Sequence, residues 1–277
     1  MVSSCTVKNW NSEDLRAECR RVRRLILEMI HAAGSGHPGG SLSCVEILVA
    51  LYRVVLHHDP ENPAMEARDR FILSKGHGAP ALYAVLARCG YFPEEDLATL
   101  RRFGSRLQGH PHMQSLRGLD CSTGSLGQGL SIAVGMALGL RLKGNPARVF
   151  CLLGDGELQE GSVWEAAMSA PALRLNNLCA VVDDNRVQLD GPTAEVMPVA
   201  PLEEKWRAFG WEVLRCPGHD VELLAAAMKE TAGKPRVIIA DTVKGKGVSF
   251  MEGESLWHGR APDDRELKEA LREVDDG

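Results

Sequence analysis

The segment Val149-Phe150-Cys151-Leu152-Leu153-Gly154-Asp155-Gly156-Glu157 is a short apolar run that ends in a polar turn. A bounded apolar run of this length is typical of a buried strand in a parallel sheet. The same pattern returns at residues 178–185, where Leu178-Cys179-Ala180-Val181-Val182 precedes Asp183-Asp184-Asn185. A helix predicted over residues 160–174 separates the two strands. These three elements predict one right-handed strand, helix, strand crossover.

Strands and helices alternate along the rest of the chain as well. Helices are predicted over residues 12–33, 93–102, 127–143 and 264–274, from residue 201, and after an N-cap at Asp220. Further strands are predicted at residues 69–74, 212–215 and 237–241. Ser43 and Glu46 have the spacing of a capping box, which predicts a helix around residues 47–51. We therefore expect an α/β fold with a mostly parallel β-sheet flanked by helices on both faces, as one domain over residues 1–277 with an N-terminal helical extension.

Composition narrows the possible functions. The chain has 277 residues, 44 % hydrophobic residues and a formal charge of -5 with both signs interspersed, which argues against a nucleic-acid partner. We find no apolar run of membrane-spanning length, and the opening residues 1–14 lack the apolar core of a signal peptide. The eight cysteines are scattered without a C-x-x-C pair, so we predict neither disulfides nor zinc. We expect a cytoplasmic protein.

The two polar turns have the residue types of a magnesium site. Both follow predicted parallel strands, whose carboxyl ends meet at one edge of the sheet, where open α/β sheets bind ligands. Mg²⁺ prefers an octahedral shell of oxygen atoms and usually keeps phosphate and water ligands. We assign three positions of such a shell to the Asp155 carboxylate, the Asn185 side chain and the Val187 carbonyl. Two phosphate oxygens and a water would complete it, and Ca²⁺ or Mn²⁺ could replace Mg²⁺.

The spacing of these turns resembles a known cofactor signature. Gly154-Asp155-Gly156, followed by 27 residues and then Asp184-Asn185, resembles the thiamine diphosphate (ThDP) motif, and GDGELQEGSVWEA with DDNRVQLDG is similar to transketolase. The resemblance implies the ThDP diphosphate-binding (PP) domain fold. It also implies that ThDP contacts Gly156, Glu157, Asn185 and the loop residues Gly124, Ser125, Leu126 and Gln128. Most relatives have proline where this chain has Ser125, so the loop is expected to be less rigid here.

Four short segments strengthen the resemblance, each with a histidine beside glycine or proline. They are Ser35-Gly36-His37-Pro38-Gly39, Ser74-Lys75-Gly76-His77-Gly78, Gly109-His110-Pro111 and Trp257-His258-Gly259. Neutral imidazole can donate and accept protons near pH 7, which suits a reaction between carbonyl and hydroxyl groups. By resemblance, His37, His77, His110 and His258 handle substrate and protons, and His77 and His258 also contact ThDP. We interpret the other histidines as structural.

The resemblance covers only the first, diphosphate-binding part of a full transketolase. It implies the N-terminal subunit of a split enzyme that transfers a two-carbon ketol unit from a ketose phosphate to an aldose phosphate, as in the pentose phosphate pathway. A separate C-terminal subunit would supply the pyrimidine-binding domain and its glutamate, most simply in a heterotetramer, with Glu160 and Glu165 at the subunit boundary. Two alternatives remain: a subunit of another ThDP enzyme, similar to deoxyxylulose-phosphate synthase or a 2-oxoacid decarboxylase, and a regulatory subunit that holds ThDP without turnover.

Two other glycine-rich segments carry weaker signals. Gly34-x-Gly36-x-x-Gly39 matches a dinucleotide-binding fingerprint, but it follows a predicted helix where the motif requires a strand. We therefore discount it. Lys244-Gly245-Lys246-Gly247 fits an anion-binding loop and a solvated loop equally well.

Overall fold

The computed structural model describes residues 10–230 and 233–277. Residues 1–9 lie outside the described residues. They include Cys5 and most of the opening segment, residues 1–14, in which the sequence shows no signal-peptide core. Five parallel strands form one sheet in the order β1-β2-β3-β5-β4, which confirms the predicted parallel α/β fold. Their bounds are β1 (Arg70–Leu73), β2 (Val149–Gly154), β3 (Leu178–Asp184), β4 (Glu212–Pro217) and β5 (Arg236–Asp241).

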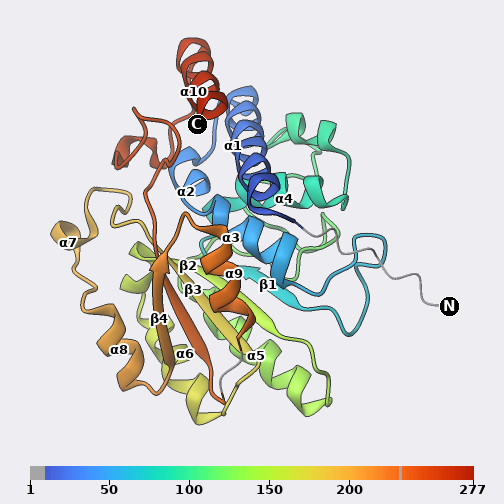
Figure 1. Ribbon diagram of the computed structural model, residues 1–277, viewed down its shortest axis with the longest axis vertical. Coiled ribbons are helices and arrows are strands. Elements are labelled where there is room, and N and C mark those ends of the chain that lie inside the picture. Colours follow the sequence, from blue (N-terminus) through green and yellow to red (C-terminus); the bar gives the residue numbers. More distant parts are fainter. Residues whose placement is uncertain (1–9, 231–232) are drawn as a thin grey trace.

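Helices precede and separate the strands, as Figure 1 shows. The α-helices are α1 (Ser12–Ala33), α2 (Pro38–Leu42), α3 (Val45–Ala50), α4 (Ala79–Cys89), α5 (Gln128–Leu142), α6 (Gly161–Ala172), α7 (Thr193–Val196), α8 (Leu202–Ala208), α9 (Val221–Lys229) and α10 (Asp264–Asp276). Short 3₁₀ turns at Gly76–Gly78, Glu94–Thr99, Gly156–Gln159 and Ser255–His258 join some of them.

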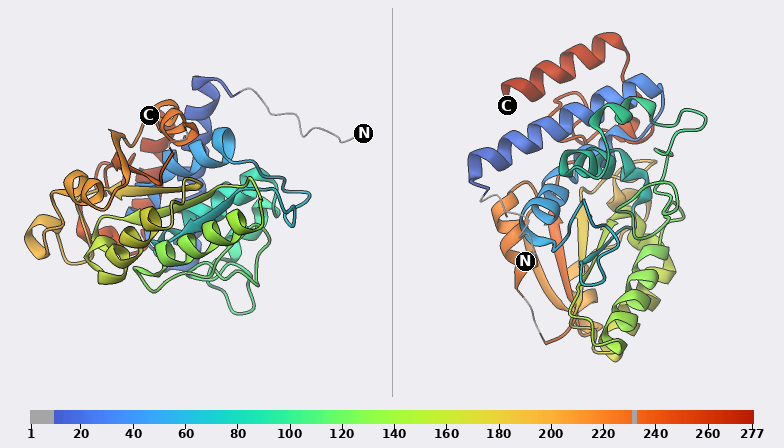
Figure 2. Two further views of the ribbon diagram at one scale, coloured as in Figure 1. Left: turned by 90° about the horizontal axis from the view of Figure 1, so that it is seen from below. Right: turned by 90° about the vertical axis from the view of Figure 1, so that its right-hand side faces the viewer.

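The strand side chains alternate between two hydrophobic cores, because successive residues of a strand point to opposite faces of the sheet. Phe150 and Leu152 pack into a core with α1, α3, α4 and α9. Cys151 and Leu153 face the other core, which contains residues of α5, α6 and α8. Figure 2 shows these helix layers on either side of the sheet. Cover on both faces explains why the strand sequences are apolar without alternation.

The first helix has the bounds that its sequence predicts. The Asn11 side chain caps it by accepting from the Asp14 amide at 2.8 Å, and Gly34 ends it in the left-handed region at φ 60°. Its apolar face packs on α4, and α10 lies along its other side (Figure 1). The final helix begins at a capping box of Asp263 and Glu266 and continues to Asp276, two residues beyond its predicted end.

Two local predictions are wrong. Ser43 and Glu46 form no capping box: Ser43 Oγ donates to Asp183 Oδ2 at 2.5 Å, and Glu46 pairs with Arg23. Tertiary partners therefore outcompete the local cap at both positions. The predicted helix at residues 93–102 is only a 3₁₀ turn, Glu94–Thr99. There the Thr99 hydroxyl donates to the Asp96 carbonyl at 2.7 Å, one turn back along the chain.

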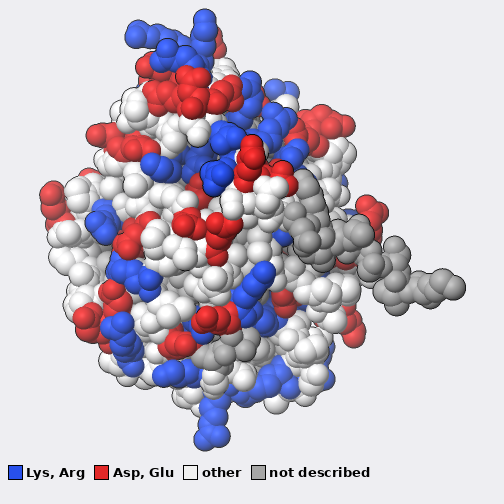
Figure 3. Space-filling model, in the orientation of Figure 1, with Lys and Arg blue, Asp and Glu red and all other residues white. Residues whose placement is uncertain are grey.

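The surface carries charges of both signs, and the cysteines of the described residues are free thiols. Both signs of charge are interspersed on the face drawn in Figure 3. Within the described parts of the chain, none of the helices combines the length and apolar character that a membrane crossing requires. The seven cysteines at described positions are free thiols, and Cys151 and Cys179 are buried inside strands.

Candidate functional site

Asp183, near the end of β3, is the centre of a buried polar cluster at the carboxyl edge of the sheet. It forms an ion pair with Lys75, and it accepts hydrogen bonds from Ser43 and Thr242. Lys75 Nζ also donates to the Gly40 carbonyl at 2.8 Å. Burial alone would raise the pKa of Asp183, but Lys75 and the hydroxyl donors keep it lowered. The cluster joins four segments that are distant in the sequence.

Asp155 lies beside this cluster with a less complete set of partners. It is only 2 % exposed, and among the described residues the only side chain that donates to it is Thr193, at 3.3 Å. Burial, and then the charge of Asp183, raise the pKa of Asp155 to about 6. The turn that carries Asp155 requires glycine, because a Cβ on Gly156 would lie 2.8 Å from the Cβ of Gln188. A buried carboxylate in this state is stabilised when a cation binds it.

The other two residues assigned to the metal follow β3 directly. Asn185 is 9 % exposed; its Oδ1 accepts from the Val187 amide at 3.1 Å, and its Nδ2 donates to Asp183 at 3.3 Å. Val187 forms an isolated bridge with Pro192, next to the Thr193 that contacts Asp155. The structure therefore brings Asp155, Asn185 and Val187 to the same edge of the sheet.

Lys244 is a second buried charge at this edge. It is 2 % exposed, and Nζ donates to the carbonyls of Val187 at 2.9 Å and Gln188 at 3.3 Å and to His258 Nδ1 at 3.0 Å. No carboxylate in the described ranges forms an ion pair with it. Burial, and then the charge of Lys75, lower the pKa of Lys244 to about 8. Within those ranges, this ammonium group has neutral acceptors and no counter-ion.

These groups fit a divalent cation with a diphosphate. A carboxylate, an amide oxygen and a carbonyl are ligands for a hard cation such as Mg²⁺. In residues 10–230 and 233–277, no group of three or more His, Cys, Asp or Glu side chains could hold a metal ion by itself, so backbone, amide or ligand oxygens would have to complete the shell. Among the same residues, Asp155 has no cation in direct contact and Lys244 has no anion. A metal diphosphate would supply both charges at one place.

The four predicted histidines converge near this edge, although they come from separate segments. His37 precedes α2, His77 lies in the turn after β1, His110 precedes α5, and His258 ends the last 3₁₀ turn. The ring centroid of His37 lies 5.6 Å from that of His77, 6.0 Å from His110 and 5.5 Å from His258. His77 and His258 are 5.1 Å apart. Lys244 links the cluster to the Val187 carbonyl.

All four imidazoles have lowered pKa values, and burial is the largest cause in each. Burial, and then Arg101, lower the pKa of His37 to about 4. Burial, and then Lys244, lower the pKa of His258 to about 3. The pKa values of the other two rings are lowered as well. The cluster is therefore neutral at pH 7, and its rings can each donate one hydrogen bond and accept another.

The predicted cofactor loop before α5 adjoins the cluster. A Cβ on Gly124, whose φ is 150°, would lie 3.2 Å from the His110 ring. A Cβ on Gly76 would lie 2.7 Å from the Gly124 backbone nitrogen, so these two segments make backbone contact. The remaining loop residues assigned to the cofactor are at least partly accessible: Ser125, Leu126 and Gln128.

Glu157 has a structural role in the described chain. Its carboxylate is 2 % exposed and accepts from the Gly127 amide at 2.9 Å, the Gly154 amide at 3.1 Å and the Ser74 hydroxyl. Glu157 thereby joins the cofactor loop to the ends of β1 and β2. Its predicted contact with the cofactor itself stays a prediction.

The five remaining histidines lie outside the cluster. Each has a ring nitrogen engaged by the protein, as expected for structural residues. Their partners are Pro262 for His31, Ala67 for His57, Tyr52 and Tyr91 for His58, Ser115 for His112, and Glu46 for His219.

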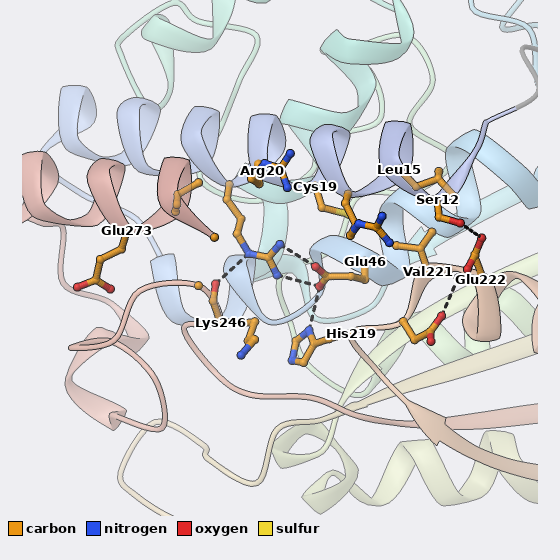
Figure 4. A pocket seen from close by; sticks show the side chains of 16 residues that line it. Ser12, Leu15, Cys19, Arg20, Glu46, His219, Val221, Glu222, Lys246 and Glu273 are labelled. Carbon is orange, nitrogen blue, oxygen red and sulfur yellow. Dashed lines mark hydrogen bonds and ion pairs between the residues drawn. The ribbon is translucent and has the colours of Figure 1, made fainter.

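A buried network behind the site holds the segment that carries Lys244. Figure 4 shows Glu46 between α1 and the loop before α9, beside a cavity of about 440 Å³. Glu46 pairs with Arg23 at 2.7 Å and accepts from His219 Nδ1 at 2.9 Å. The Val243 amide donates to His219 Nε2 at 2.8 Å, and Arg23 Nε donates to the Lys246 carbonyl at 2.9 Å.

Val243 and Lys246, on either side of Lys244, are thus both linked to the Glu46 carboxylate, the first through His219 and the second through Arg23. Burial alone would raise the pKa of Glu46, but Arg23 and His219 lower it to about 2. Glu46 therefore stays charged under all ordinary conditions, and the network positions Lys244 from behind.

Two functional candidates, Lys75 and Arg101, were not identified from the sequence, and a third, Lys244, was identified only together with Lys246. Lys75 lies within the quoted segment Ser74-Lys75-Gly76-His77-Gly78, and its place directly after a strand was a usable signal. Lys244 was not distinguished from Lys246, although only Lys244 is buried. Arg101 contacts His37, but nothing in the sequence separates it from the neighbouring arginines.

Comparisons with known proteins identify the family. The family model described as "Transketolase, thiamine diphosphate binding domain" matches residues 16–274. The chain is 48 % identical over 265 residues to the 6-deoxy-6-sulfo-D-fructose transketolase subunit SqwG of Clostridium sp. (strain MSTE9), covering 95 % of this chain and 96 % of the relative. It is 41 % identical over 271 residues to an apulose-4-phosphate transketolase subunit of Actinobacillus succinogenes, covering 97 % and 98 %.

Longer transketolases match over part of their length. The human transketolase is 40 % identical over 261 residues, which are 94 % of this chain and 42 % of the human protein. The crystal structure of the Campylobacter jejuni transketolase superposes with a TM-score of 0.89 at 33 % identity, covering 96 % of this chain and 43 % of that one. The chain belongs to the transketolase family and spans its thiamine diphosphate binding domain.

Proposed function

We propose that this chain is the N-terminal subunit of a ThDP- and Mg²⁺-dependent transketolase. It would transfer a two-carbon ketol unit from a ketose phosphate, or a ketose with a similar anionic end, to an aldose phosphate. The observation that carries the proposal is the link through Lys244, which donates both to the Val187 carbonyl and to His258 of the histidine cluster. A cofactor held at the strand edge would place its reactive end beside these imidazoles.

The residues present suggest how the cofactor would be held. Asp155, Asn185 and the Val187 carbonyl would bind the metal, and Lys244 would pair with the diphosphate. Gly156 and the loop at residues 124–128 would approach the cofactor through their backbone. When bound, ThDP would supply the chemistry that breaks and forms the carbon–carbon bond.

The four histidines would handle the substrate. Neutral, half-buried rings suit hydrogen bonding to sugar hydroxyl and carbonyl oxygens without adding charge next to a thiazolium cation. Two relatives of matching length are named as transketolase subunits for 6-deoxy-6-sulfo-D-fructose and apulose 4-phosphate, so the names of these relatives point to different donors on one scaffold. A panel of candidate donor and acceptor sugars is therefore needed to test the substrate of this chain.

A partner chain is part of the proposal. Two relatives of which this chain covers 96 % and 98 % are named as subunits of transketolases. Glu160 and Glu165 are exposed, one directly before α6 and one in its first turns, and Glu160 lies next to Gly127 of the cofactor loop; we place the subunit boundary here. The whole chain would act as one ThDP-binding domain with its N-terminal helix, in a heterotetramer with the C-terminal chain. The free thiols favour the cytoplasm as its location.

Reconstitution with the cognate C-terminal chain tests the function. The assembled complex, supplied with ThDP and Mg²⁺, is expected to transfer a ketol unit from xylulose 5-phosphate or one of the sugars above to an aldose phosphate. Product analysis with pyruvate in place of the ketose checks the alternative of a synthase or decarboxylase. Cofactor binding without any turnover across the panel would instead favour a regulatory role.

A further inference from the structure

Arg101 and Lys244 contact two of the histidines in the same way. Arg101 Nη2 lies 3.4 Å from His37 Nδ1, and Lys244 Nζ lies 3.0 Å from His258 Nδ1. Guanidinium and ammonium groups can only donate hydrogen bonds. Both Nδ1 atoms must therefore accept, and in a neutral ring the single proton then belongs to Nε2. The two cations select the same tautomer in both rings.

Resting on the proposed function, we propose that His37 and His258 act as hydrogen-bond donors through Nε2, and that Arg101 and Lys244 are the positioning residues that hold them in this tautomer. The ligand group is an oxygen that accepts from both rings, such as a sugar carbonyl or the alkoxide formed from it. In this arrangement neither ring offers a free lone pair for removing a substrate proton.

The Nε2 atoms are available for this role. No described residue forms a hydrogen bond with Nε2 of His37 or of His258. Neither atom is among the fully buried unpartnered atoms of the described chain, so both keep some accessible surface. The two rings meet edge to face at 88°, with centroids 5.5 Å apart. The two rings are therefore close enough to contact the same small ligand.

The conformation and surroundings of Arg101 are energetically unfavourable in two respects. Its φ is 59°, in the left-handed region that non-glycine residues rarely adopt. Its amide donates to the Leu107 carbonyl at 2.8 Å, and Nη1 donates to the Ser35 hydroxyl at 2.7 Å. Its Nε is buried without a hydrogen-bond partner among the described residues. A strained backbone and an unsatisfied buried nitrogen are expected where a side chain is positioned for function.

The surroundings keep both rings neutral, as the proposed tautomer requires. Burial and the neighbouring cations lower the pKa of His37 to about 4 and that of His258 to about 3. The charged and titratable groups that face these two rings are Arg101, Lys75, Lys244, His77 and His110. No carboxylate of the described chain contributes to either shift, so no nearby anion favours the imidazolium form.

The first test measures the tautomer directly, without catalysis. Nitrogen-15 NMR of the full chain, with His37 assigned through His37→Gln, is expected to show a proton on Nε2 and a bare Nδ1 from pH 6 to 8. Arg101→Gln is expected to raise the pKa of His37 and allow the two tautomers to exchange. Arg101→Lys, which keeps the charge, should largely restore the wild-type pattern. Arg102→Gln, at the exposed neighbour, is the matched control and should change neither.

The second test uses the complex with its partner chain. Arg101→Gln is expected to lower kcat about 10- to 100-fold, the range for losing the outer partner that orients a functional histidine, with ThDP retention unchanged. A proton on Nδ1 of His37 in the wild type, or an unchanged His37 in Arg101→Gln, would overturn the proposal. So would unchanged kcat in that variant.

The two tests distinguish this inference from the proposed function. If the NMR pattern is as stated but the wild-type complex converts no sugar phosphate, the proposed function is wrong, and with it the assignment of a sugar oxygen as the ligand. If the wild-type complex is active but the NMR pattern differs, only the tautomer and the role of Arg101 are wrong.

Discussion

The ammonium nitrogen of Lys244 lies 2.9 Å from the carbonyl oxygen of Val187, the same oxygen that the metal motif assigns to a divalent ion. One carbonyl oxygen has two lone pairs, so it can accept from the lysine and bind the ion together. This contact joins the diphosphate edge of the site to the histidine cluster. It also gives a reason for a buried lysine that has no carboxylate partner among the described residues.

Removing the Lys244 charge should weaken cofactor binding. We expect Lys244→Met to reduce the affinity of the chain or its complex for Mg²⁺–ThDP at least about tenfold, because the diphosphate loses a charge-assisted partner in a buried site. Calorimetry measures the change. Lys246→Met is the matched control: Lys246 is 3.1 Å from Glu252 on a half-exposed side chain, and its loss should change affinity less than about twofold. Equal effects of the two variants would refute the assignment.

Asp155→Asn should separate stability from binding. The folded pKa of Asp155 is raised from 3.8 to about 6, so the cofactor-free chain loses stability as pH rises through that interval. The amide has no charge to bury and should make the cofactor-free chain more stable at pH 7.5, by about 2 kcal/mol. It should abolish metal-dependent ThDP retention at the same time.

Denaturant unfolding at several pH values and ThDP retention with and without Mg²⁺ measure the two effects of Asp155→Asn. The stability gain is expected to vanish near pH 4. Asp190→Asn, in the exposed loop after β3, serves as the control and should leave both quantities unchanged. Retention of ThDP by the Asp155 variant would show that the ion binds elsewhere.

Glu46→Gln should destabilise the chain from behind the active site. It leaves the buried Arg23 without its counter-ion and replaces one of the two carboxylate oxygens shared by Arg23 and His219 with an NH₂ donor, which should lower the free energy of unfolding by about 3 kcal/mol. Because the folded pKa of Glu46 is lowered from 4.5 to about 2, this stability is fully present above pH 4.5 and is lost as pH falls toward 2.

Unfolding curves of wild type and Glu46→Gln are therefore expected to approach each other in acid. Glu222→Gln, an exposed carboxylate lining the same cavity, should cost less than about 0.5 kcal/mol. A difference that stays constant down to pH 2.5 would contradict the ion-pair explanation.

Two glycines of α5 should respond oppositely to the same substitution. A Cβ on Gly129 would lie 2.4 Å from Ser74 Oγ and 2.7 Å from its Cα, so Gly129→Ala should cost about 2 kcal/mol or more. A Cβ on Gly135 would meet nothing within 4 Å, so Gly135→Ala should stabilise the isolated chain by about 0.5 to 1 kcal/mol through helix propensity. Thermal unfolding of both variants measures these changes in stability. A similar loss of stability in both variants would show that backbone strain, and not the contact with Ser74, determines the effect of the substitution.

Much of the fold could be predicted because its signals are local. Residues 149–154 and 178–184 are buried on both faces and therefore carry uninterrupted apolar runs. Asn11 and Gly34 limit α1 through hydrogen bonds to neighbouring residues. The capping box at Ser43 was predicted wrongly for the opposite reason, since its hydroxyl has a better acceptor in Asp183, 140 residues away.

The amino-acid sequence alone determined the two strands of the metal motif, the residue types at the sheet edge and the four histidine segments. Only the tertiary structure decided how the charges are partnered. Three such outcomes depend on contacts between distant segments: which of Lys244 and Lys246 is buried, which cation faces His37, and why Asp183 has a cation partner while Asp155 has only a hydroxyl donor among the described side chains. Local periodicity reflects the burial of a face, but hydrogen bonds and ion pairs depend on angstrom-scale distances that only the packed chain sets.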